Sequence, residues 1–197
     1  ALEGFKLVQP PPEPRRVPTL EELRRFCAVL DNPRYRAIFL MLAKTGLRPC
    51  DLLSLRVSDI DWERRAVYPR RRSRTKRVWV TFFDGECEEA LREYMRAYRV
   101  ADRLFPVDVR VLHKVFRRAS EKAGVKITAG MLRKWFCEEM LRRGVPEVYV
   151  DAFCGRVPRS VLARHYVDLS PEKLKEIYER AGLPKVALSG HDRSRDR

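Results

Sequence analysis

The sequence predicts a mainly α-helical domain that carries one small antiparallel β-sheet, an α+β fold. Apolar residues recur at helical spacing over most of the chain from residue 20 onward. Only two neighbouring runs are rich in β-branched and aromatic residues, as strands are. The 197 residues, of which 45% are hydrophobic, are enough for one domain with a buried core.

The first two expected helices are marked by their caps. Thr19 and Glu22 form a capping-box pattern at the start of the run LEELRRFCAVL. Asn32 is a suitable N-cap, and Pro33 suits the first helical position before RYRAIFLMLAKT. Gly46 is expected to end this second helix, because glycine readily adopts the left-handed conformation that closes helices.

The next segments contain the expected sheet. A short helix is expected to resume at Pro49 and to stop before Asp59. The runs RRAVYPRR at 64–71 and KRVWVTFF at 76–83 are expected to pair as a hairpin with a basic tip. The remaining chain is expected to be helical, because glycine and proline separate apolar-periodic runs. These expected helices span 86–100, 108–123, 128–143, 146–153, 158–165 and 171–181.

Composition divides the chain into three parts. Residues 1–18 contain the run VQPPPEPRRVP and are expected to be a proline-rich linker or N-terminal extension. Residues 19–183 are expected to form the folded domain. Residues 184–197 are expected to be a disordered basic tail. The proline-rich linker suggests that a further domain lies upstream.

The charge of the chain predicts a polyanionic partner. Lysine and arginine total 42 against 27 acidic residues, which gives a net charge of +15. Such an excess favours nucleic acid. An anionic membrane fits less well, because the basic residues are spread over several segments and not gathered on one amphipathic helix. A solvated basic surface without a specific partner is the alternative.

Other composition features predict an intracellular protein without a metal or a cofactor. No long apolar run could span a membrane, and the start ALEGFKLVQPPP has no signal-peptide core, so a cytoplasmic location is expected. The three histidines are scattered and suggest no metal site. The cysteines are odd in number and form no CxxC pair, so they are expected to be buried free thiols; they are Cys27, Cys50, Cys87, Cys137 and Cys154.

The stretch AKTGLRPCDLLSLRVSDID is the most informative one. Arg48 follows the helix-ending Gly46 and precedes Pro49, so it is expected at a bend between two helices. Asp51 is three residues further on and is close enough to steady the arginine. By itself, this pattern also fits an ordinary surface arginine at a helix junction.

The same stretch resembles the signature of the tyrosine recombinase (phage integrase) family, TG-[LM]-R followed by E/D-L-x-x-L and D-I. The likeness continues in order through the basic hairpin, a box ending in L-R, a C-G turn and a late tyrosine. It therefore implies the catalytic-domain fold of that family. At two positions where the family usually has a histidine, this chain has another residue. These differences point to a divergent branch, such as the integrases of archaeal viruses or plasmids.

The resemblance assigns catalytic roles to individual residues. Arg48 matches the first catalytic arginine, and Arg133 in ITAGMLRKWF matches the second. Arg156 in FCGRVPRS stands in place of a histidine and is taken as catalytic. Tyr166 in RHYVDLSPEKL matches the nucleophile. Gly130 stands where the family has a histidine or lysine, so the proton transfer made there has no obvious agent.

The hairpin is similar to the one that carries the catalytic lysine of the family. Lys76 is its only lysine and is taken as the general acid, although Arg72 or Arg74 lies nearer the usual position. A guanidinium hardly gives up its proton, which favours Lys76. The residues expected to contact DNA phosphates are Arg70, Arg71, Arg72, Arg74, Arg77, Lys134 and His165.

The resemblance implies a site-specific recombinase that works without a metal ion, ATP or another cofactor. Tyr166 would attack a phosphate of double-stranded DNA and leave a 3′-phosphotyrosyl link, while arginines stabilise the charge that develops. It also implies a tetramer on DNA, with a monomer in isolation left open, and no membrane partner. Two rivals remain: a type IB topoisomerase-like enzyme, and a catalytically impaired DNA-binding protein of the same fold.

Overall fold

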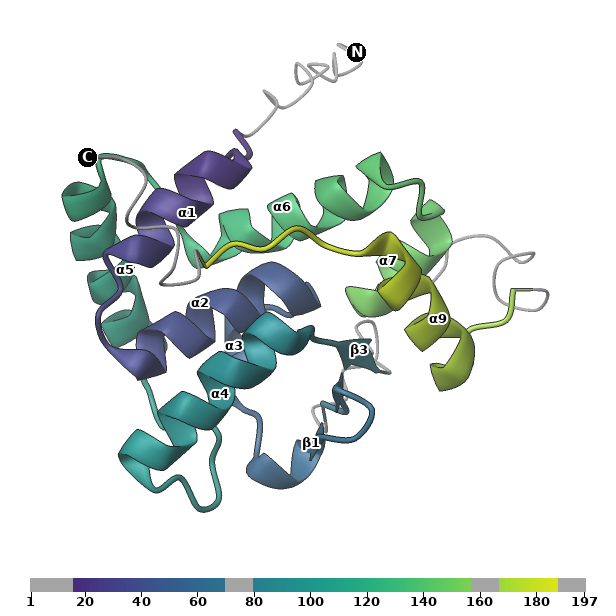
Figure 1. Cartoon of the computed structure of the whole chain (residues 1–197), viewed down its shortest axis with the longest axis horizontal. Coiled ribbons are helices and arrows are strands. Elements are labelled where there is room, and N and C mark those ends of the chain that lie inside the picture. Colours follow the sequence, from purple (N-terminus) through teal and green to yellow (C-terminus); the bar gives the residue numbers. More distant parts are fainter. Residues whose placement is uncertain (1–15, 70–79, 157–166, 188–197) are drawn as a thin grey trace, which may run out of the picture.

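A computed structural model describes residues 16–69, 80–156 and 167–187 of the chain. It confirms the expected fold class, because the described residues are mostly helical and include a small antiparallel sheet at one side of the helices, beside α9 (Figure 1). The helices are α1 (Leu20–Ala28), α2 (Pro33–Thr45), α3 (Pro49–Leu53), the 3-10 turn η1 (Val57–Asp59), α4 (Gly85–Tyr98), α5 (Val109–Ala123), α6 (Ala129–Arg142), α7 (Glu147–Phe153) and α9 (Pro171–Ala181). The helix expected at 158–165 lies outside the described residues.

The predicted caps are confirmed. Thr19 and Glu22 satisfy each other's backbone N–H groups in a capping box at the start of α1. The Asn32 side chain accepts a hydrogen bond at the start of α2, with Pro33 in the first turn. Gly46 ends α2 in the left-handed conformation, with φ of 66°. Local sequence signals therefore determine where these two helices begin and end.

The sheet consists of β1 (Ile60–Asp61), β2 (Ala66–Val67) and β3 (Thr81–Phe82), paired antiparallel in that order. The expected pairing of the two strand-like runs is confirmed, with Ala66 opposite Phe82 and Val67 opposite Thr81. The basic tip of this hairpin lies outside the described residues. Strand β1 was not expected, since its residues follow directly after a segment with helical spacing.

The helix expected from Pro49 to residue 58 is wrong in its length. It ends at Leu53, and only the short turn η1 follows. The backbone beyond Leu53 is drawn away by a distant segment, because Leu104 N–H donates to the Leu55 carbonyl at 2.9 Å and Val57 N–H donates to the Asp102 carbonyl at 2.8 Å. These non-local hydrogen bonds replace the helical ones.

Helix α2 is the centre of the core. It lies between α4 and α6 and packs against both (Figure 1). All side chains from Ala37 to Ala43 are buried, so α2 is apolar on every face, as a core helix is. Because α2 is held on all sides, the turn that follows it at Gly46 has a fixed position. The candidate site is built on this turn.

The segment after α9 returns across the molecule toward α1 (Figure 1). Val186 is fully buried, and its N–H donates to a carboxylate oxygen of Glu86 on α4 at 2.9 Å. Arg24 of α1 donates to the Lys185 carbonyl at 3.3 Å. Residues 184–187 are therefore packed against the domain. The wider division into linker, domain and tail stays a prediction.

Among the described residues, no helix is both long enough and apolar enough to cross a membrane.

Candidate active site

Arg48 is held at the junction between α2 and α3. Gly46 ends α2, Pro49 opens α3, and Arg48 is the extended residue that precedes the first turn of α3. Its Nη1 lies 3.4 Å from Oδ2 of Asp51, as expected from their spacing. The Arg48 side chain remains 25% exposed. The guanidinium is therefore oriented but still accessible to an anion.

Arg133 ties two chain segments together. It lies in the second turn of α6, and its Nη1 donates to the Gly46 carbonyl. Its Nη2 donates to the Cys154 carbonyl at 2.7 Å. Burial lowers the pKa of Arg133, and the nearby positive charges of Arg48 and Arg156 act in the same direction. The two carbonyls that Arg133 contacts belong to residues two positions before Arg48 and two positions before Arg156, so the three arginines lie in one neighbourhood.

Gly46 is required by space as well as by conformation. A Cβ atom on Gly46 would lie 2.6 Å from Cδ1 of Phe136 and 3.1 Å from Sγ of Cys154. The α2 turn thus packs directly onto α6 and onto the end of α7. The sequence identified Gly46 as a helix end but contained no sign of this close approach, which brings its carbonyl to Arg133.

Arg156 follows the end of α7. Its backbone N–H donates to the Asp151 carbonyl at 2.8 Å, and its Nη1 donates to Oδ1 of Asp151 at 2.7 Å. The hydrogen bond to Asp151 raises the pKa of Arg156. Its Nη2 also lies 3.9 Å from Sγ of Cys137 on α6. Asp151 thus orients Arg156, and the contact with Cys137 brings it beside the helix that carries Arg133.

Three predicted catalytic residues thus meet, each from a different element. Arg48 comes from the turn after α2, Arg133 from α6, and Arg156 from the end of α7. We call these residues the arginine cluster. Planar guanidinium groups suit bidentate binding of phosphate oxygens. The cluster is therefore chemically suited to a phosphate, and to the extra negative charge of a phosphoryl-transfer transition state.

Of the remaining predicted site residues, Lys134 is the one that lies in the described part of the chain. Lys134 follows Arg133 on α6, where successive side chains point about 100° apart around the helix axis. Its predicted phosphate contact therefore stays a prediction. The other predicted residues lie outside the described part of the chain; they are Arg70, Arg71, Arg72, Arg74, Lys76, Arg77, His165 and Tyr166.

Gly130 opens toward free space near the cluster. It lies in the first turn of α6, three residues before Arg133, so the two positions share a helix face. A Cβ atom on Gly130 would meet no heavy atom within 4 Å. The described residues therefore leave room for a side chain at position 130, so crowding does not explain why a glycine stands there.

Two cysteines belong to the same neighbourhood, which the sequence did not predict. All five cysteines are free thiols, as expected. Cys50, however, is exposed and Cys137 is only partly buried, so the expectation of burial is wrong for these two. Sγ of Cys137 lies 3.4 Å from Sγ of Cys154. Their separation of 17 residues gave no sequence signal for this contact.

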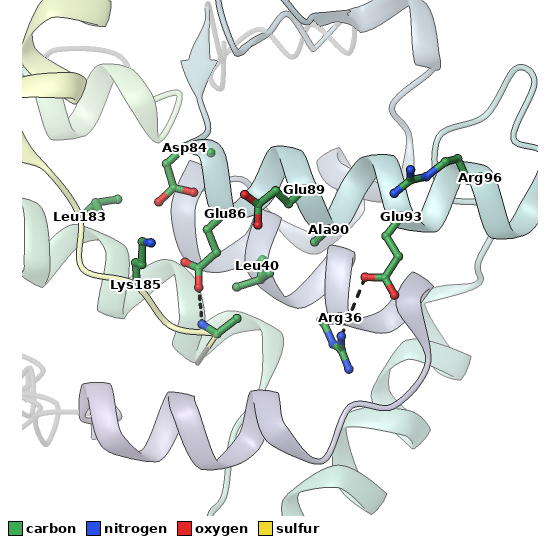
Figure 2. Close-up of a pocket in the computed structure, with 12 residues that line it drawn as sticks. Arg36, Leu40, Asp84, Glu86, Glu89, Ala90, Glu93, Arg96, Leu183 and Lys185 are labelled. Carbon is green, nitrogen blue, oxygen red and sulfur yellow. Dashed lines mark hydrogen bonds and ion pairs between the residues drawn. The ribbon is translucent and has the colours of Figure 1, made fainter. Parts of the chain in front are cut away.

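A large groove elsewhere on the molecule is lined by four carboxylates and three basic side chains (Figure 2); they are Asp84, Glu86, Glu89 and Glu93, and Arg36, Arg96 and Lys185. It has a volume of about 610 Å³ and lies between α2, α4 and the segment after α9. Figure 2 shows carboxylates of α4 along it, with Glu86 bonded to the returning segment and Glu93 paired with Arg36. Carboxylates repel phosphate, so this groove is not a candidate DNA site.

The described residues contain no group of three or more histidine, cysteine, aspartate or glutamate side chains that could hold a metal ion.

Comparison with known proteins decides the family. The profile of the phage integrase family matches residues 17–173. The chain belongs to this family. The matched region includes all three members of the arginine cluster, and the predicted resemblance to tyrosine recombinases is confirmed.

The chain is also similar to named archaeal proteins of this family. It is 29% identical over 177 residues to tyrosine recombinase XerA of Saccharolobus solfataricus, a match that covers 85% of this chain and 60% of that protein. It is 27% identical over 195 residues to tyrosine recombinase XerA of Thermococcus onnurineus, covering 92% and 69%. The chain thus spans well under the full length of these relatives.

Solved structures show the same fold. The crystal structure of XerA recombinase matches with a TM-score of 0.62 and 25% identity, over 90% of this chain and 68% of that chain. The integrase of mycobacterium phage Brujita matches with a TM-score of 0.65 and 19% identity, over 93% and 65%. The Tn1549 transposon integrase, solved in complex with circular intermediate DNA, matches with a TM-score of 0.63 and 16% identity, over 83% and 64%.

Proposed function

We propose that this chain is the catalytic domain of a site-specific tyrosine recombinase that breaks and rejoins double-stranded DNA. The observation that carries the proposal is the convergence of Arg48, Arg133 and Arg156 from three separate elements. The relatives named tyrosine recombinase XerA support the same reaction class. A protein that acts on DNA would work inside the cell.

The reaction follows from the chemistry of the proposed residues. The phenolic oxygen of Tyr166 attacks a DNA phosphorus, an O–P bond forms, and the bond to the 5′ oxygen breaks. Lys76 donates a proton to that leaving oxygen, so a 5′-hydroxyl is released. Attack by a 5′-hydroxyl of another strand reverses the steps. The phosphotyrosyl bond conserves the energy of the original bond, so no ATP is needed.

The arginine cluster has two tasks in this reaction. Its guanidinium groups hold the non-bridging phosphate oxygens and stabilise the charge of the five-coordinate transition state. Their positive charge also favours the phenolate form of Tyr166, whose pKa is otherwise near ~10. Because the arginines supply this charge, we propose that the cleavage step requires no metal ion.

Helix α5 offers a surface for the DNA backbone. Leu112, Phe116 and Ala119 of α5 are buried, and α5 packs against α1 and against α3, which follows Arg48. Its exposed face carries Arg110, Lys114, Arg117 and Arg118, which are spaced for one side of a helix. Such a basic face contacts phosphates without reading sequence. Site choice would then need further protomers, in a tetramer on DNA, and an upstream DNA-binding domain.

A catalytically impaired DNA-binding protein remains the second candidate, and Gly130 is the observation that favours it. Glycine has no side chain that could donate or accept a proton. In this case the arginine cluster would bind phosphate, but strand cleavage would be absent. A single experiment distinguishes the two candidates.

The experiment captures DNA covalently from a pool of nicked duplexes with randomised sequence. In such suicide substrates the fragment beyond the nick diffuses away after cleavage, so rejoining fails and the adduct accumulates. The recombinase proposal predicts adducts that resist denaturation and form equally well with a chelator present. DNA retained before denaturation, but never after it, would instead identify a binding protein. A topoisomerase would relax a supercoiled plasmid but would rejoin the same strand. Strand exchange between two DNA molecules that carry a captured site therefore excludes the topoisomerase alternative.

A further inference from the structure

Two thiols lie within reach of each other beneath the arginine cluster. Cys137 is on α6 and Cys154 directly follows α7, and their Sγ atoms are 3.4 Å apart. A disulfide bond is about 2.0 Å long. The sulfur atoms therefore have to approach by only about 1.4 Å to form one. Since α6 and α7 already pack together, no large rearrangement is needed.

The two thiols differ in exposure and in pKa, as the two members of a reacting thiol pair should. Cys137 is partly exposed, whereas Cys154 is buried. The hydrogen bond between the two thiols lowers the pKa of Cys137, and the charges of Arg156 and Arg133 contribute to this shift. The same hydrogen bond, together with burial, raises the pKa of Cys154. Cys137 is thus the more accessible and more acidic thiol of the pair, and Cys154 is the buried thiol beside it.

The remaining cysteines lack this combination. Cys27 and Cys87 lie in the core, where burial raises the pKa of Cys27 to about 12 and that of Cys87 well above its ordinary value. Cys50 is exposed on α3, and its Sγ lies 3.7 Å from a carboxylate oxygen of Asp51. Among the five cysteines, all of which the structure describes, Cys137 and Cys154 are the pair whose sulfur atoms are in contact.

We propose that Cys137 and Cys154 are a redox-active pair, which a hydroperoxide oxidises to a disulfide that links α6 to the end of α7. The Cys137 thiolate attacks a peroxide oxygen, so an S–O bond forms, the O–O bond breaks and the leaving oxygen takes up a proton. The Cys154 sulfur then attacks the sulfenic acid and loses its proton, and water leaves. Two electrons pass from sulfur to the peroxide.

The disulfide would disturb the arginine cluster, a consequence that rests on the proposed function. The Cys154 carbonyl is an acceptor for Arg133, and Sγ of Cys137 is a neighbour of Arg156. Closing the S–S bond moves one or both of these groups and removes the thiolate. Misplacement of a catalytic group by about 1 Å can cost about 100-fold in rate. We therefore expect the oxidised protein to form the DNA adduct at least about 10-fold more slowly than the reduced protein.

The first test measures the disulfide alone. A Cys50→Ser variant removes the exposed thiol, which could otherwise link two molecules. After treatment with hydrogen peroxide, its intact mass should fall by two hydrogen atoms, and non-reducing peptide mapping should recover Cys137 joined to Cys154. Dithiothreitol should reverse both changes. Adding Cys137→Ser or Cys154→Ser should abolish the mass loss. Retention of all four thiols, or a cross-link that involves Cys27 or Cys87, overturns the proposal.

The second test measures the consequence for DNA. Adduct formation by the Cys50→Ser variant is compared before oxidation, after oxidation and after reduction, and the same series is run with Cys154→Ser added. Inhibition should be reversible and should require Cys154. An unchanged rate in protein whose disulfide has been verified by mass overturns the inhibitory effect. Absence of any adduct from reduced protein contradicts the recombinase proposal instead, and leaves the thiol result standing.

Discussion

Arg133 donates a hydrogen bond from Nη1 to the carbonyl oxygen of Gly46, the residue that ends α2 in the left-handed conformation. Nη2 of the same side chain donates to the Cys154 carbonyl. One guanidinium thus joins the turn before Arg48 to the turn before Arg156. The geometry of the whole cluster therefore depends on the backbone at Gly46.

Replacing Gly46 by alanine should destabilise the protein more than an ordinary left-handed glycine would. The new Cβ atom would collide with Phe136, in addition to the strain of a positive φ. We expect a loss of about 3 kcal/mol in the free energy of unfolding, measured by denaturant titration. Gly124→Ala is the matched control, because Gly124 has nearly the same φ with nothing within 4 Å. It should cost only about 1 kcal/mol. Equal losses would show that the close approach is unimportant.

A histidine at position 130 should increase the rate of strand cleavage. The space at Gly130 is open, and the position shares a helix face with Arg133. A positioned imidazole can transfer a proton in the transition state, so we expect Gly130→His to raise the rate of adduct formation about 10-fold or more. Gly130→Ala is the control for helix propensity and should leave the rate unchanged. An equal increase in both variants would attribute the gain to the helix and not to the imidazole.

Lys44 should contribute strongly to stability, because it is a fully buried cation. Its Nζ lies 2.5 Å from Oδ2 of Asp84, 2.9 Å from Oε2 of Glu86 and 2.9 Å from the Pro184 carbonyl. Lys44→Met leaves these acceptors without their cation, which should cost about 3 kcal/mol in unfolding free energy. Adding Glu86→Gln should recover part of the loss. A loss in Lys44→Met below about 1 kcal/mol would contradict the role of this ion pair.

The same lysine predicts a pH dependence. Burial by itself lowers the pKa of Lys44, but attraction to Asp84 and Glu86 outweighs burial and raises the pKa above its ordinary value of 10.5. A raised pKa stabilises the folded state below pH 10.5, and this contribution is lost as the pH rises through the folded pKa. The stability difference between the native chain and Lys44→Met should therefore stay constant near neutrality and shrink only above pH 10.5. Chemical denaturation at several pH values tests this.

Asp151 should matter for cleavage more than for stability. It orients Arg156 through a contact of 2.7 Å, and the two side chains are 49% and 23% exposed. Such a pair contributes less than about 1 kcal/mol to folding. Asp151→Asn should therefore leave stability nearly unchanged but slow adduct formation.

The control for this variant is Glu88→Gln. The Arg65–Glu88 pair has the same separation, 2.7 Å, and similar exposures of 51% and 18%. The pair joins the turn before β2 to α4, Glu88 also pairs with Arg92, and none of these residues belongs to the arginine cluster. Glu88→Gln should match Asp151→Asn in stability without slowing cleavage. Parallel losses of activity in both variants would argue against a specific role for Asp151.

Local signals predicted most of the fold, and non-local contacts explain the errors. The caps of α1 and α2 depend on residues within one turn, so they could be identified from the sequence. The early end of α3 could not, because Leu55 and Val57 form backbone hydrogen bonds with a segment about 50 residues away. Strand β1 is two residues long and pairs with the neighbouring β2, so it is too short to give a strand pattern of its own.

The sequence suggested residues for the candidate site but not the geometry of that site. Resemblance indicated Arg48, Arg133 and Arg156, which the structure brings together. It did not indicate that Arg133 is held by two backbone carbonyls, because any residue can supply a carbonyl. The contact between Cys137 and Cys154 depends on how α6 packs against α7, which sequence spacing does not encode.

Identification of the residue that bears the DNA tests the recombinase proposal most directly. Adducts trapped on a nicked duplex are digested, and tandem mass spectrometry locates the nucleotide-bearing peptide. We predict that the nucleotide is on Tyr166, and that Tyr166→Phe binds the same DNA without forming an adduct. Tyr178 is an unsuitable nucleophile, because its hydroxyl is buried and donates to the Lys44 carbonyl at 2.9 Å. An adduct on any other residue, or one that persists in Tyr166→Phe, would contradict the proposed mechanism.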